Sequence, residues 1–594
     1  MPKPRPFLLP ILLLIATTCI ITNNAASAIA GAGEFLPLPP QDPMPQPSSS
    51  FPGEWQLLHA SIGVSAMHMQ LLPGDFVLMF DRTDTGPSNL SLPAVSPCAT
   101  TTTSTSSSGV GAAVMDCTAH SVLLDLRSNM LHPYPLATNP WCSSGALLPN
   151  GTLLQTGGFS TGDRIARLFS PSTGWVELPS ALAARRWYAS DVLLPDGRVL
   201  VLGGRRQFNF EFFPPDSGGG APSPPTFFPF LEETSEPESE NNLYPFLHLL
   251  PDGTVFVFAN DRAAVLDPYN RAPLRRLPPV PGGVPRNYPS SGSSVLLPLH
   301  PSTPTHAEVL VCGGAPRGAY LLALRNATFV PADRTCVRVA PTEVDPAWAV
   351  EEMPAARVMG DMVLLPTGDV LIVNGAAAGT AGWELGREPV TAPVVYTPGK
   401  VVGERFQVMK ASTIPRMYHS SAALDTYGRV LVGGSNPHVG YVFAGDNVTY
   451  PTELSLEAFL PPYMDARLDG VRPRIVAAPA EVGYGEATAV RFEVPVGAEA
   501  AEGESSLGEL RVVAVAPAFA THSFGMNQRV VELAVGRVVA AVDDGVIGVY
   551  EAEVAAPPTP GVAPPGYYLW FVLHAGVPSS AASWVRMRPL GPGY

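Results

Sequence analysis

Residues 193–204, LLPDGRVLVLGG, contain the pattern that decides the fold. Two leucines lead into a Pro-Asp-Gly turn, an apolar strand follows, and two glycines end the segment. Asp-Gly between two apolar runs is a strong β-hairpin signal, because the glycine adopts the positive φ that tight hairpin turns require. The sequence therefore predicts a β-hairpin at this position.

The same phrase returns along the chain with a period of about 45 to 60 residues, which is the size of a blade in kelch-type propellers. The clear copies are LLPNGTLLQTGG (147–158), LLPDGTVFVFAN (249–260), LLPTGDVLIVNG (364–375) and ALDTYGRVLVGG (423–434), and more distant copies are VLLPLHPSTPTHAEVLVCGG (295–314) and LLPGDFVLMF (71–80). Seven copies predict seven blades. The alternative is a β-sandwich in which the hairpins resemble one another by chance.

From about Arg472 the repeat stops, and a different series of strands begins with segments such as LRVVAVAPAF and GYYLWFVL. This pattern favours a separate C-terminal sandwich. We therefore predict an all-β chain, with a seven-bladed kelch-type β-propeller over 55–468 and an immunoglobulin-like β-sandwich over 469–594. A signal peptide over 1–30 and a Pro-rich lead segment over 31–54 precede them.

The N-terminal residues have the pattern of a secretory signal, with Lys3 and Arg5 ahead of an apolar run and small residues at Ala26 to Ala28. We expect a secreted protein of the extracellular space or cell wall, monomeric and without a membrane span. The net charge of -15 leaves no basic face for phosphates, which excludes nucleic acid as a partner. Sequons typical of glycosylated loops occur at Asn89, Asn150, Asn326 and Asn447.

The cysteine count identifies one unusual residue. Without Cys19 of the signal segment, five cysteines are left, and an exported protein seldom leaves one unpaired. Cys98 and Cys117 flank a Ser/Thr-rich loop, and another local segment separates Cys312 from Cys336, so elimination predicts the disulfides Cys98–Cys117 and Cys312–Cys336. Cys142 is then left without a partner.

The repeat also places side chains at matching positions of different blades. Nine residues before the turn glycine stand Cys142, Tyr188, Tyr244, Met359 and His419, and Tyr418 precedes His419. Equivalent positions of successive blades surround the propeller axis at one end. Two tyrosines and a histidine there suit copper, given a second histidine. The candidates for it are His438 and His522, which a loop of the C-terminal domain would carry into the axial channel.

Four motifs resemble those of copper-radical oxidases, and specifically of plant glyoxal oxidase-like proteins. They are WCSSG around Cys142, RRWYAS around Tyr188, PRMYHS around Tyr418 and His419, and THSFGMNQR around His522. The resemblance implies one copper ion with Tyr188, Tyr418, His419 and His522 as metal ligands. It further implies a thioether cross-link between Cys142 and Tyr188, whose phenol holds the radical, and makes Tyr418 the axial ligand and the general base.

The implied activity is oxidation of aldehydes such as glyoxal and methylglyoxal, as hydrates, to carboxylic acids, with O2 reduced to H2O2. Oxidation of a C-OH centre removes two electrons, of which Cu(II) accepts one and the cross-linked tyrosine the other, while Tyr418 takes the substrate proton. One alternative is a galactose oxidase-type enzyme that oxidises galactosyl or other primary alcohols in the cell wall. The other is a kelch-type binding propeller without turnover.

One departure from galactose oxidase is Arg206, which stands where that relative has the tryptophan that stacks on the cross-link, and this change argues against galactose specificity. Phe208 and Trp187 are the candidates to shield the radical instead. Tyr244 either lines the pocket or packs in the channel. Two roles are likewise open for Arg185, Arg186 and Arg416, which would either orient a polar substrate or pair with carboxylates.

Overall fold

The computed structural model describes residues 51–591 apart from 95, 97, 103–112, 216–221, 447, 496–508 and 541–547. The predicted signal peptide, most of the Pro-rich lead and Asn447 lie outside the described residues. Within the described part, no helix is long and apolar enough to cross a bilayer.

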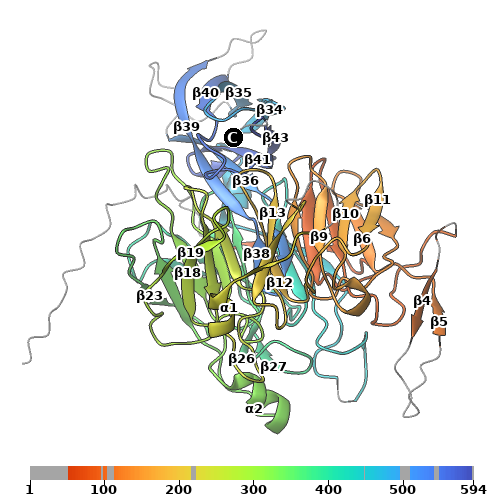
Figure 1. The fold of residues 1–594 in the computed structure, drawn as a ribbon. Helices are drawn as coiled ribbons and strands as arrows, with labels where there is room; N and C mark the ends of the chain where they lie inside the picture. The colour runs from red at the N-terminus through yellow and green to blue at the C-terminus, as the bar shows by residue number, and fades with distance from the viewer. Residues whose placement is uncertain are drawn as a thin grey trace, which may run out of the picture. The chain divides into compact units, whose positions relative to one another are not determined.

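The repeated hairpins form the inner strands of seven four-stranded antiparallel blades (Figure 1). Blade 1 consists of β2 (His68–Leu72), β3 (Phe76–Phe80), β6 (Ser121–Asp125) and β7 (Met130–Tyr134). Blade 2 consists of β8 (Ser144–Leu147), β9 (Leu153–Thr156), β10 (Ala166–Ser170) and β11 (Gly174–Leu178). Blade 3 consists of β12 (Ala189–Leu193), β13 (Val199–Gly203), β14 (Asn209–Phe213) and β15 (Thr226–Phe227). Blade 4 consists of β16 (Phe246–Leu249), β17 (Val255–Ala259), β18 (Arg262–Asp267) and β19 (Ala272–Arg276). Blade 5 consists of β20 (Ser293–Leu296), β21 (Val309–Cys312), β22 (Thr335–Val339) and β23 (Ala349–Glu352). The prediction of an all-β seven-bladed propeller is therefore confirmed.

The last two blades close the ring. Blade 6 consists of β24 (Asp361–Leu364), β25 (Val370–Val373), β28 (Val394–Tyr396) and β29 (Phe406–Val408). Blade 7 consists of β30 (Ser420–Leu424), β31 (Val430–Gly434), β32 (Leu456–Leu460) and β1 (Glu54–His59). The outer strand of blade 7 thus comes from the start of the propeller, where Trp55 pairs with Phe459. This pairing joins the two ends of the repeat and covers an edge that would otherwise be exposed.

A few elements lie outside the blades. They are the hairpin of β4 (Ala99–Thr102) and β5 (Ala113–Asp116), the hairpin of β26 (Ala376–Gly379) and β27 (Gly386–Pro389), and the helices α1 (Pro229–Glu233) and α2 (Ala319–Asn326).

The C-terminal domain is the predicted β-sandwich. Its strands are β33 (Arg474–Ala477), β34 (Glu481–Val482), β35 (Ala487–Glu493), β36 (Leu510–Ala516), β39 (Arg529–Ala540), β40 (Val549–Ala555), β41 (Gly566–His574), β42 (Val577–Pro578) and β43 (Ser583–Met587). The long strand β39 belongs to both layers, because its first half pairs with β36 and its second half with β40, with a register shift between Val535 and Val538. Trp570 and Phe492 are fully buried in the core.

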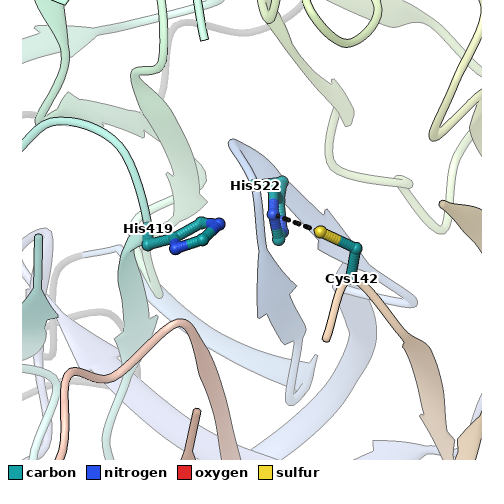
Figure 2. Close-up of side chains that lie close together, drawn as sticks. All are labelled: Cys142, His419 and His522. Carbon is teal, nitrogen blue, oxygen red and sulfur yellow. Dashed lines mark hydrogen bonds between the residues drawn. The ribbon is translucent and has the colours of Figure 1, made fainter. Parts of the chain in front are cut away.

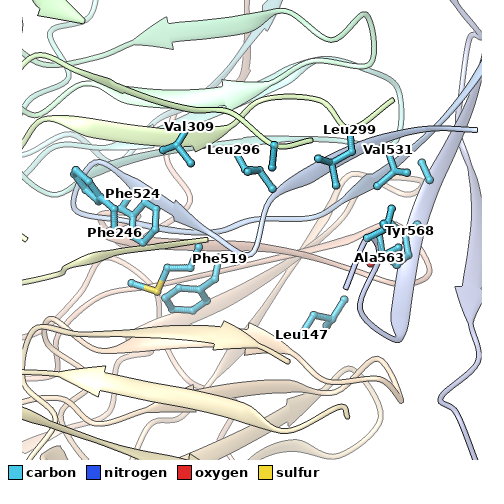
Figure 3. Packing of buried hydrophobic residues seen from close by; sticks show 14 of the residues in the cluster. Leu147, Phe246, Leu296, Leu299, Val309, Phe519, Phe524, Val531, Ala563 and Tyr568 are labelled. Carbon is cyan, nitrogen blue, oxygen red and sulfur yellow. The ribbon is translucent and has the colours of Figure 1, made fainter. Parts of the chain in front are cut away.

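A β-hairpin of β37 (Phe519–Thr521) and β38 (Phe524–Met526) leaves the sandwich and joins blade 1, where Thr521 pairs with His68. Its apolar residues extend the hydrophobic core into the propeller, since Phe519 and Phe524 belong to the same buried cluster as Leu147, Phe246 and Leu296 (Figure 3). The predicted entry of the C-terminal domain into the axial channel is thus observed.

Candidate metal centre

Backbone hydrogen bonds link residues that stand nine positions before the turn glycine in neighbouring blades. The amide of Tyr188 donates a hydrogen bond to the carbonyl of Cys142 at 2.9 Å, and the amide of Tyr244 donates to the carbonyl of Tyr188 at 3.0 Å. Each residue thus contacts its equivalent in the neighbouring blade. Cys142, Tyr188, Tyr244, Met359 and His419 all have φ between 50° and 66°. This conformation is uncommon for residues other than glycine, costs about 1 to 3 kcal/mol, and clusters at functional sites.

His522 reaches the same place from the other domain. It forms the two-residue turn of the β37–β38 hairpin with Ser523, and both have positive φ, at 44° and 69°, as a type I′ turn requires. The residues after the hairpin hold it in the propeller. The Asn527 side chain accepts a hydrogen bond from the Leu193 amide at 2.8 Å and donates to the Gly145 carbonyl at 3.1 Å.

The opposite side of the hairpin is fixed in the same way. The Gln528 amide group accepts a hydrogen bond from the Leu364 amide at 3.0 Å and donates to the Met362 carbonyl at 2.8 Å. The guanidinium of Arg529 donates to the carbonyl of Leu249. The motif that identified His522 therefore also contains the residues that bind this hairpin to blades 2, 3, 4 and 6.

Three buried side chains converge at the tip of the hairpin. Potential ligand atoms of Cys142, His419 and His522 lie within 4.8 Å of one another, and the Cys142 Sγ is 3.1 Å from the His522 Nε2 (Figure 2). No side chain of the three is more than 7% exposed. The structure thus brings together residues from blade 2, blade 7 and the C-terminal domain.

The histidines have the properties of metal ligands. Both ring nitrogens of His419 are buried without a hydrogen-bond partner, which is costly unless another ligand binds them. Burial lowers the pKa of His522 to about 3 and that of His419 well below its ordinary value. Both rings are therefore neutral at physiological pH, the form that coordinates metals. The Thr521 hydroxyl, 2.7 Å from the His522 Nδ1, orients the second ring and leaves its Nε2 to face the site.

The two predicted tyrosines lie beside the histidines. The rings of Tyr418 and His419 are stacked with centroids 3.8 Å apart, and the Tyr188 ring lies 6.1 Å from that of His522. Burial raises the pKa of both phenols well above 10. Without a bound cation both groups are therefore neutral, and only a strong positive charge at the site would hold them as phenolates. Two phenols and two neutral imidazoles suit a divalent copper ion.

Tyr288 is a residue of the site that the sequence reasoning missed. Its hydroxyl oxygen is 3.2 Å from that of Tyr188 and 2.9 Å from that of Tyr418, and its ring stacks on the Tyr188 ring with centroids 4.5 Å apart. It precedes the diverged fifth repeat, in which no turn glycine stands at the usual place, so the register count could not reach it. The only available signal was its motif, NYPSSGSSVLLPL.

The ring contacts also show what surrounds Tyr188. Besides Tyr288, Trp187 lies against it with centroids 4.8 Å apart. Phe208 packs instead in a cluster of blades 3 and 4 with Phe210, and Arg206 is exposed. Of the two predicted shielding residues, the structure places only Trp187 beside the phenol.

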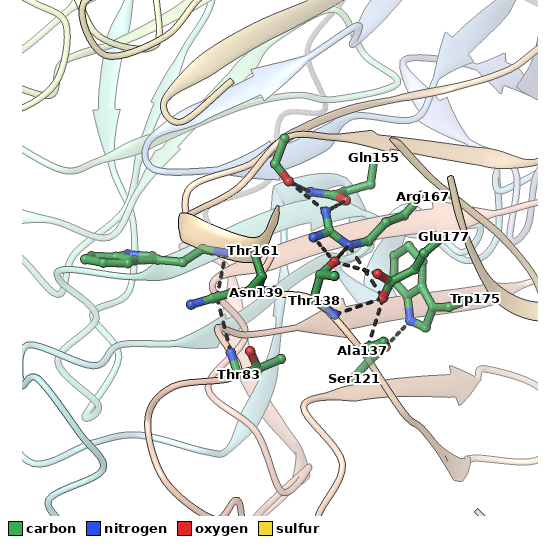
Figure 4. Close-up of polar contacts among 12 residues, drawn as sticks. Thr83, Ser121, Ala137, Thr138, Asn139, Gln155, Thr161, Arg167, Trp175 and Glu177 are labelled. Carbon is green, nitrogen blue, oxygen red and sulfur yellow. Dashed lines mark hydrogen bonds and ion pairs between the residues drawn. The ribbon is translucent and has the colours of Figure 1, made fainter. Parts of the chain in front are cut away.

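The cysteine predictions are confirmed. Cys98–Cys117 and Cys312–Cys336 form disulfides, and Cys142 is free and fully buried. Burial raises the pKa of its thiol. A network of hydrogen bonds positions the segment that carries Cys142 (Figure 4). The buried Arg167 donates hydrogen bonds to Gln155 and Thr138, and the Asn139 side chain accepts one from the Trp141 amide at 3.0 Å.

Several other candidates have structural roles. His438 contacts Glu384 and the Tyr450 carbonyl through its two nitrogens, at 2.5 and 2.8 Å, and is not part of the cluster. The Tyr244 hydroxyl donates to the Ser143 carbonyl at 2.9 Å. The three arginines pair with carboxylates: Arg186 with Glu211 at 2.7 Å, Arg416 with Glu457 at 2.9 Å, and the exposed Arg185 with Asp163 at 3.4 Å.

Comparison with known proteins gives consistent matches over most of the chain. The family model "Glyoxal oxidase N-terminus" matches residues 67–463, and "Galactose oxidase-like, Early set domain" matches residues 472–587. The aldehyde oxidase GLOX1 of Arabidopsis thaliana is 42% identical over 91% of this chain and 85% of its own length. The aldehyde oxidase GLOX of Vitis pseudoreticulata is 41% identical over 91% of this chain and 98% of its own.

Among solved structures, a fungal alcohol oxidase of the AA5 family, in complex with copper, aligns with a TM-score of 0.61. The alignment covers 90% of this chain and 100% of that chain at 17% identity. At this identity the likeness concerns the fold.

Proposed function

The chain belongs to the glyoxal oxidase family, and from this premise we propose that it is a secreted copper-radical oxidase that converts aldehydes, as hydrates, to carboxylic acids and reduces O2 to H2O2. Its domains would be the propeller over 55–468 and the sandwich over 469–594. One observation supports the proposal most strongly: five side chains of the required types, from three blades and a second domain, meet in one buried cluster.

The proposed ligands of one copper ion are Tyr188, Tyr418, His419 and His522. Bound copper supplies a one-electron acceptor and a coordination position for the substrate oxygen. Since oxidation of C-OH removes two electrons, a second one-electron acceptor is needed, and Tyr188 joined to Cys142 by a thioether fills that role. Their location on neighbouring blades, linked through the backbone at 2.9 Å, favours this cross-link.

Tyr418 is the proposed general base. Its burial raises the pKa of its phenol, so that the protonated form is strongly favoured once it has taken the substrate proton. The aromatic contacts of Trp187 and Tyr288 cover the Tyr188 ring and exclude water from the phenol that would carry the radical.

The relatives named aldehyde oxidase favour aldehydes over the alternative of galactosyl or other primary alcohols. A non-catalytic binding propeller has no need for a histidine whose two nitrogens are buried and unpartnered. The two disulfides agree with an oxidising compartment outside the cytosol. We extend this to secretion into the cell wall, with the protein acting as a monomer.

The direct test is peptide mass spectrometry of protein expressed with copper. The proposal expects a species in which the Cys142 and Tyr188 peptides are joined with the loss of two hydrogens. Protein from which copper is withheld should show two separate peptides. A copper-loaded protein that never forms the link would overturn the radical mechanism. A peroxide-coupled assay with glyoxal, methylglyoxal and galactose then tests the substrate, and a preference for galactose would overturn the aldehyde assignment.

A further inference from the structure

The hydroxyl of Tyr288 touches both oxygens that would take part in the reaction. It lies 3.2 Å from the Tyr188 oxygen, which would take the hydrogen from the substrate carbon, and 2.9 Å from the Tyr418 oxygen, which would take the proton from the substrate hydroxyl. A substrate that reacts with both groups must place its carbon and its oxygen between them. The reacting carbon therefore lies within reach of Tyr288.

Tyr288 also differs from its two neighbours in exposure. Tyr188 and Tyr418 are buried, at 5% and 4% exposed, whereas Tyr288 is partly exposed. Its ring stacks on that of Tyr188, and its hydroxyl contacts both buried phenol oxygens. A substrate that reaches the cluster along the partly exposed Tyr288 would meet this hydroxyl.

The position of the hydroxyl gives it a specific role. Tyr288 is not one of the proposed metal ligands, so its hydroxyl is free of the copper ion while it contacts the oxygens of both proposed tyrosine ligands. Its oxygen can donate one hydrogen bond and accept others. A hydrated aldehyde carries two hydroxyls on its reacting carbon, while a primary alcohol carries one. With the first hydroxyl beside Tyr418, the second is available to Tyr288.

Resting on the function proposed above, we propose that Tyr288 is a specificity-determining residue that selects geminal diols over primary alcohols. Its hydroxyl binds the second hydroxyl of an aldehyde hydrate while Tyr418 takes the proton of the first. A primary alcohol presents hydrogen at that position and leaves the Tyr288 hydroxyl without this bond. The substrate class of the site is thus the hydrates of small aldehydes.

The test compares methylglyoxal with hydroxyacetone, which share a carbon skeleton and differ by one hydroxyl on the reacting carbon once methylglyoxal is hydrated. Tyr288→Phe keeps the stacked ring and removes only the hydroxyl. We expect kcat/KM for methylglyoxal to fall about tenfold and that for hydroxyacetone to stay within about twofold, as the loss of one hydrogen bond to one substrate predicts. An equal fall in kcat/KM for both substrates, or no fall for either, would overturn the proposal.

The matched control is Tyr244→Phe. Tyr244 is a buried tyrosine whose ring also lies near that of Tyr188, at 5.5 Å, but its hydroxyl donates to the Ser143 carbonyl. It should keep the wild-type ratio of kcat/KM for the two substrates. Intact mass and copper content of each variant show whether the cross-link and the metal site have formed.

A binding measurement on the wild-type protein does not depend on how the variant folds. Hexafluoroacetone hydrate is a geminal diol without a hydrogen on its central carbon, so it cannot be oxidised, and hexafluoroisopropanol is its counterpart with one hydroxyl. By calorimetry, the copper-loaded wild type should bind the diol more tightly, and Tyr288→Phe should lose about tenfold in affinity for the diol alone. Equal wild-type affinities would overturn the proposal. A wild-type protein that forms no cross-link and oxidises neither substrate would refute the proposed function itself.

Discussion

The amide of Tyr188 donates a hydrogen bond to the carbonyl of Cys142 at 2.9 Å, which joins the two residues across the boundary between blades 2 and 3. Both residues have the left-handed backbone conformation, with φ of 66° and 54°. The contact belongs to the backbone and does not depend on the cysteine sulfur. Replacing that sulfur should therefore affect chemistry much more than folding.

Cys142→Ala tests this separation. We expect loss of the cross-linked peptide and of oxidase activity, with a loss of only about 1 kcal/mol in the free energy of unfolding of the copper-free protein, typical of a small core truncation. The control, Cys98→Ala with Cys117→Ala, removes a disulfide that spans 19 residues and should cost about 2 to 4 kcal/mol while the cross-link still forms. Urea unfolding and peptide mass give the two readouts. If Cys142→Ala destabilises as much as the control, the sulfur has a structural role.

His419→Leu tests the unpartnered imidazole. The substitution removes two buried nitrogens that have no hydrogen-bond partner, so the melting temperature without copper should stay the same or rise. Copper at about 100 times its dissociation constant should stabilise the wild type by roughly 2.7 kcal/mol and leave the variant unchanged. His438→Gln is the control, because both of its nitrogens are bonded. It should lower the melting temperature and keep the response to copper. A copper shift in His419→Leu would exclude His419 as a ligand.

The inner strands and the convergence of Cys142, Tyr188 and His419 could be predicted because both follow from the repeated turn. Each turn glycine fixes the register of a hairpin, and the period of the repeat fixes the number of blades. Cys142, Tyr188 and His419 therefore fall at equivalent positions before any contact is known. His522 lies outside the repeat, so the sequence left it as one of two candidates beside His438, and the resemblance then favoured it. Its approach depends on Asn527 and Gln528, whose partners are backbone groups in distant blades.

Features without a repeated local signal could not be predicted. Tyr288 stands before a repeat that has lost its turn glycine, so the register count had no starting point there. Strand β1 pairs with β32, about 400 residues away in the sequence, and alternating polarity alone does not indicate such a partner. The arginine roles were also open, since the sequence does not show that Glu211 and Glu457 lie beside Arg186 and Arg416.

Arg186→Met separates a structural role from a role in substrate binding. The fully buried guanidinium pairs with Glu211 at 2.7 Å and donates to the Gly203 carbonyl at 2.7 Å. Its removal leaves the Glu211 carboxylate buried without its counter-charge, although the Ala183 and Ala184 amides still donate to it, so we expect a loss of about 3 to 5 kcal/mol in unfolding free energy with KM unchanged. Arg185→Met, next to it but with a side chain 76% exposed, should change stability by less than about 0.5 kcal/mol. A raised KM in folded Arg186→Met would indicate contact with substrate.

Titration of the Asp191 carboxyl should account for part of the dependence of stability on pH. Complete burial raises the pKa of its carboxyl from 3.8 to about 7, although hydrogen bonds from Thr156 and Ser144 oppose the shift. Between these values the native state binds more protons than the unfolded state, so stability falls as the pH rises and levels off above about 7. Asp191→Asn removes this titration, and its stability relative to wild type should improve by a few kcal/mol between pH 4 and pH 8. Urea midpoints at several pH values measure the difference. A difference that stays constant would show that Asp191 titrates normally.

Asn527→Gly tests whether the C-terminal domain positions His522. Asn527 has φ of 67°, which glycine adopts without strain, so the substitution removes only the side chain and its hydrogen bonds to Leu193, Gly145 and Asp191. The hairpin that carries His522 would then be held less firmly against blades 2 and 3. We expect at least a tenfold loss of copper affinity, together with roughly 1 to 3 kcal/mol of unfolding free energy.

The matched control is Asn374→Gly, which removes a buried asparagine that also has a positive φ, of 63°. The side chain of Asn374 donates to Asp361 at 2.7 Å, and Asn374 contacts no residue of the hairpin through it. This variant should lose a similar amount of stability and keep its copper affinity, because blade 6 supplies none of the proposed ligands. Copper titrations of both variants, performed well below their unfolding midpoints, measure the two copper affinities. If the two variants lose copper affinity equally, the loss reflects general destabilisation and the hairpin anchor has no separate effect on the metal centre.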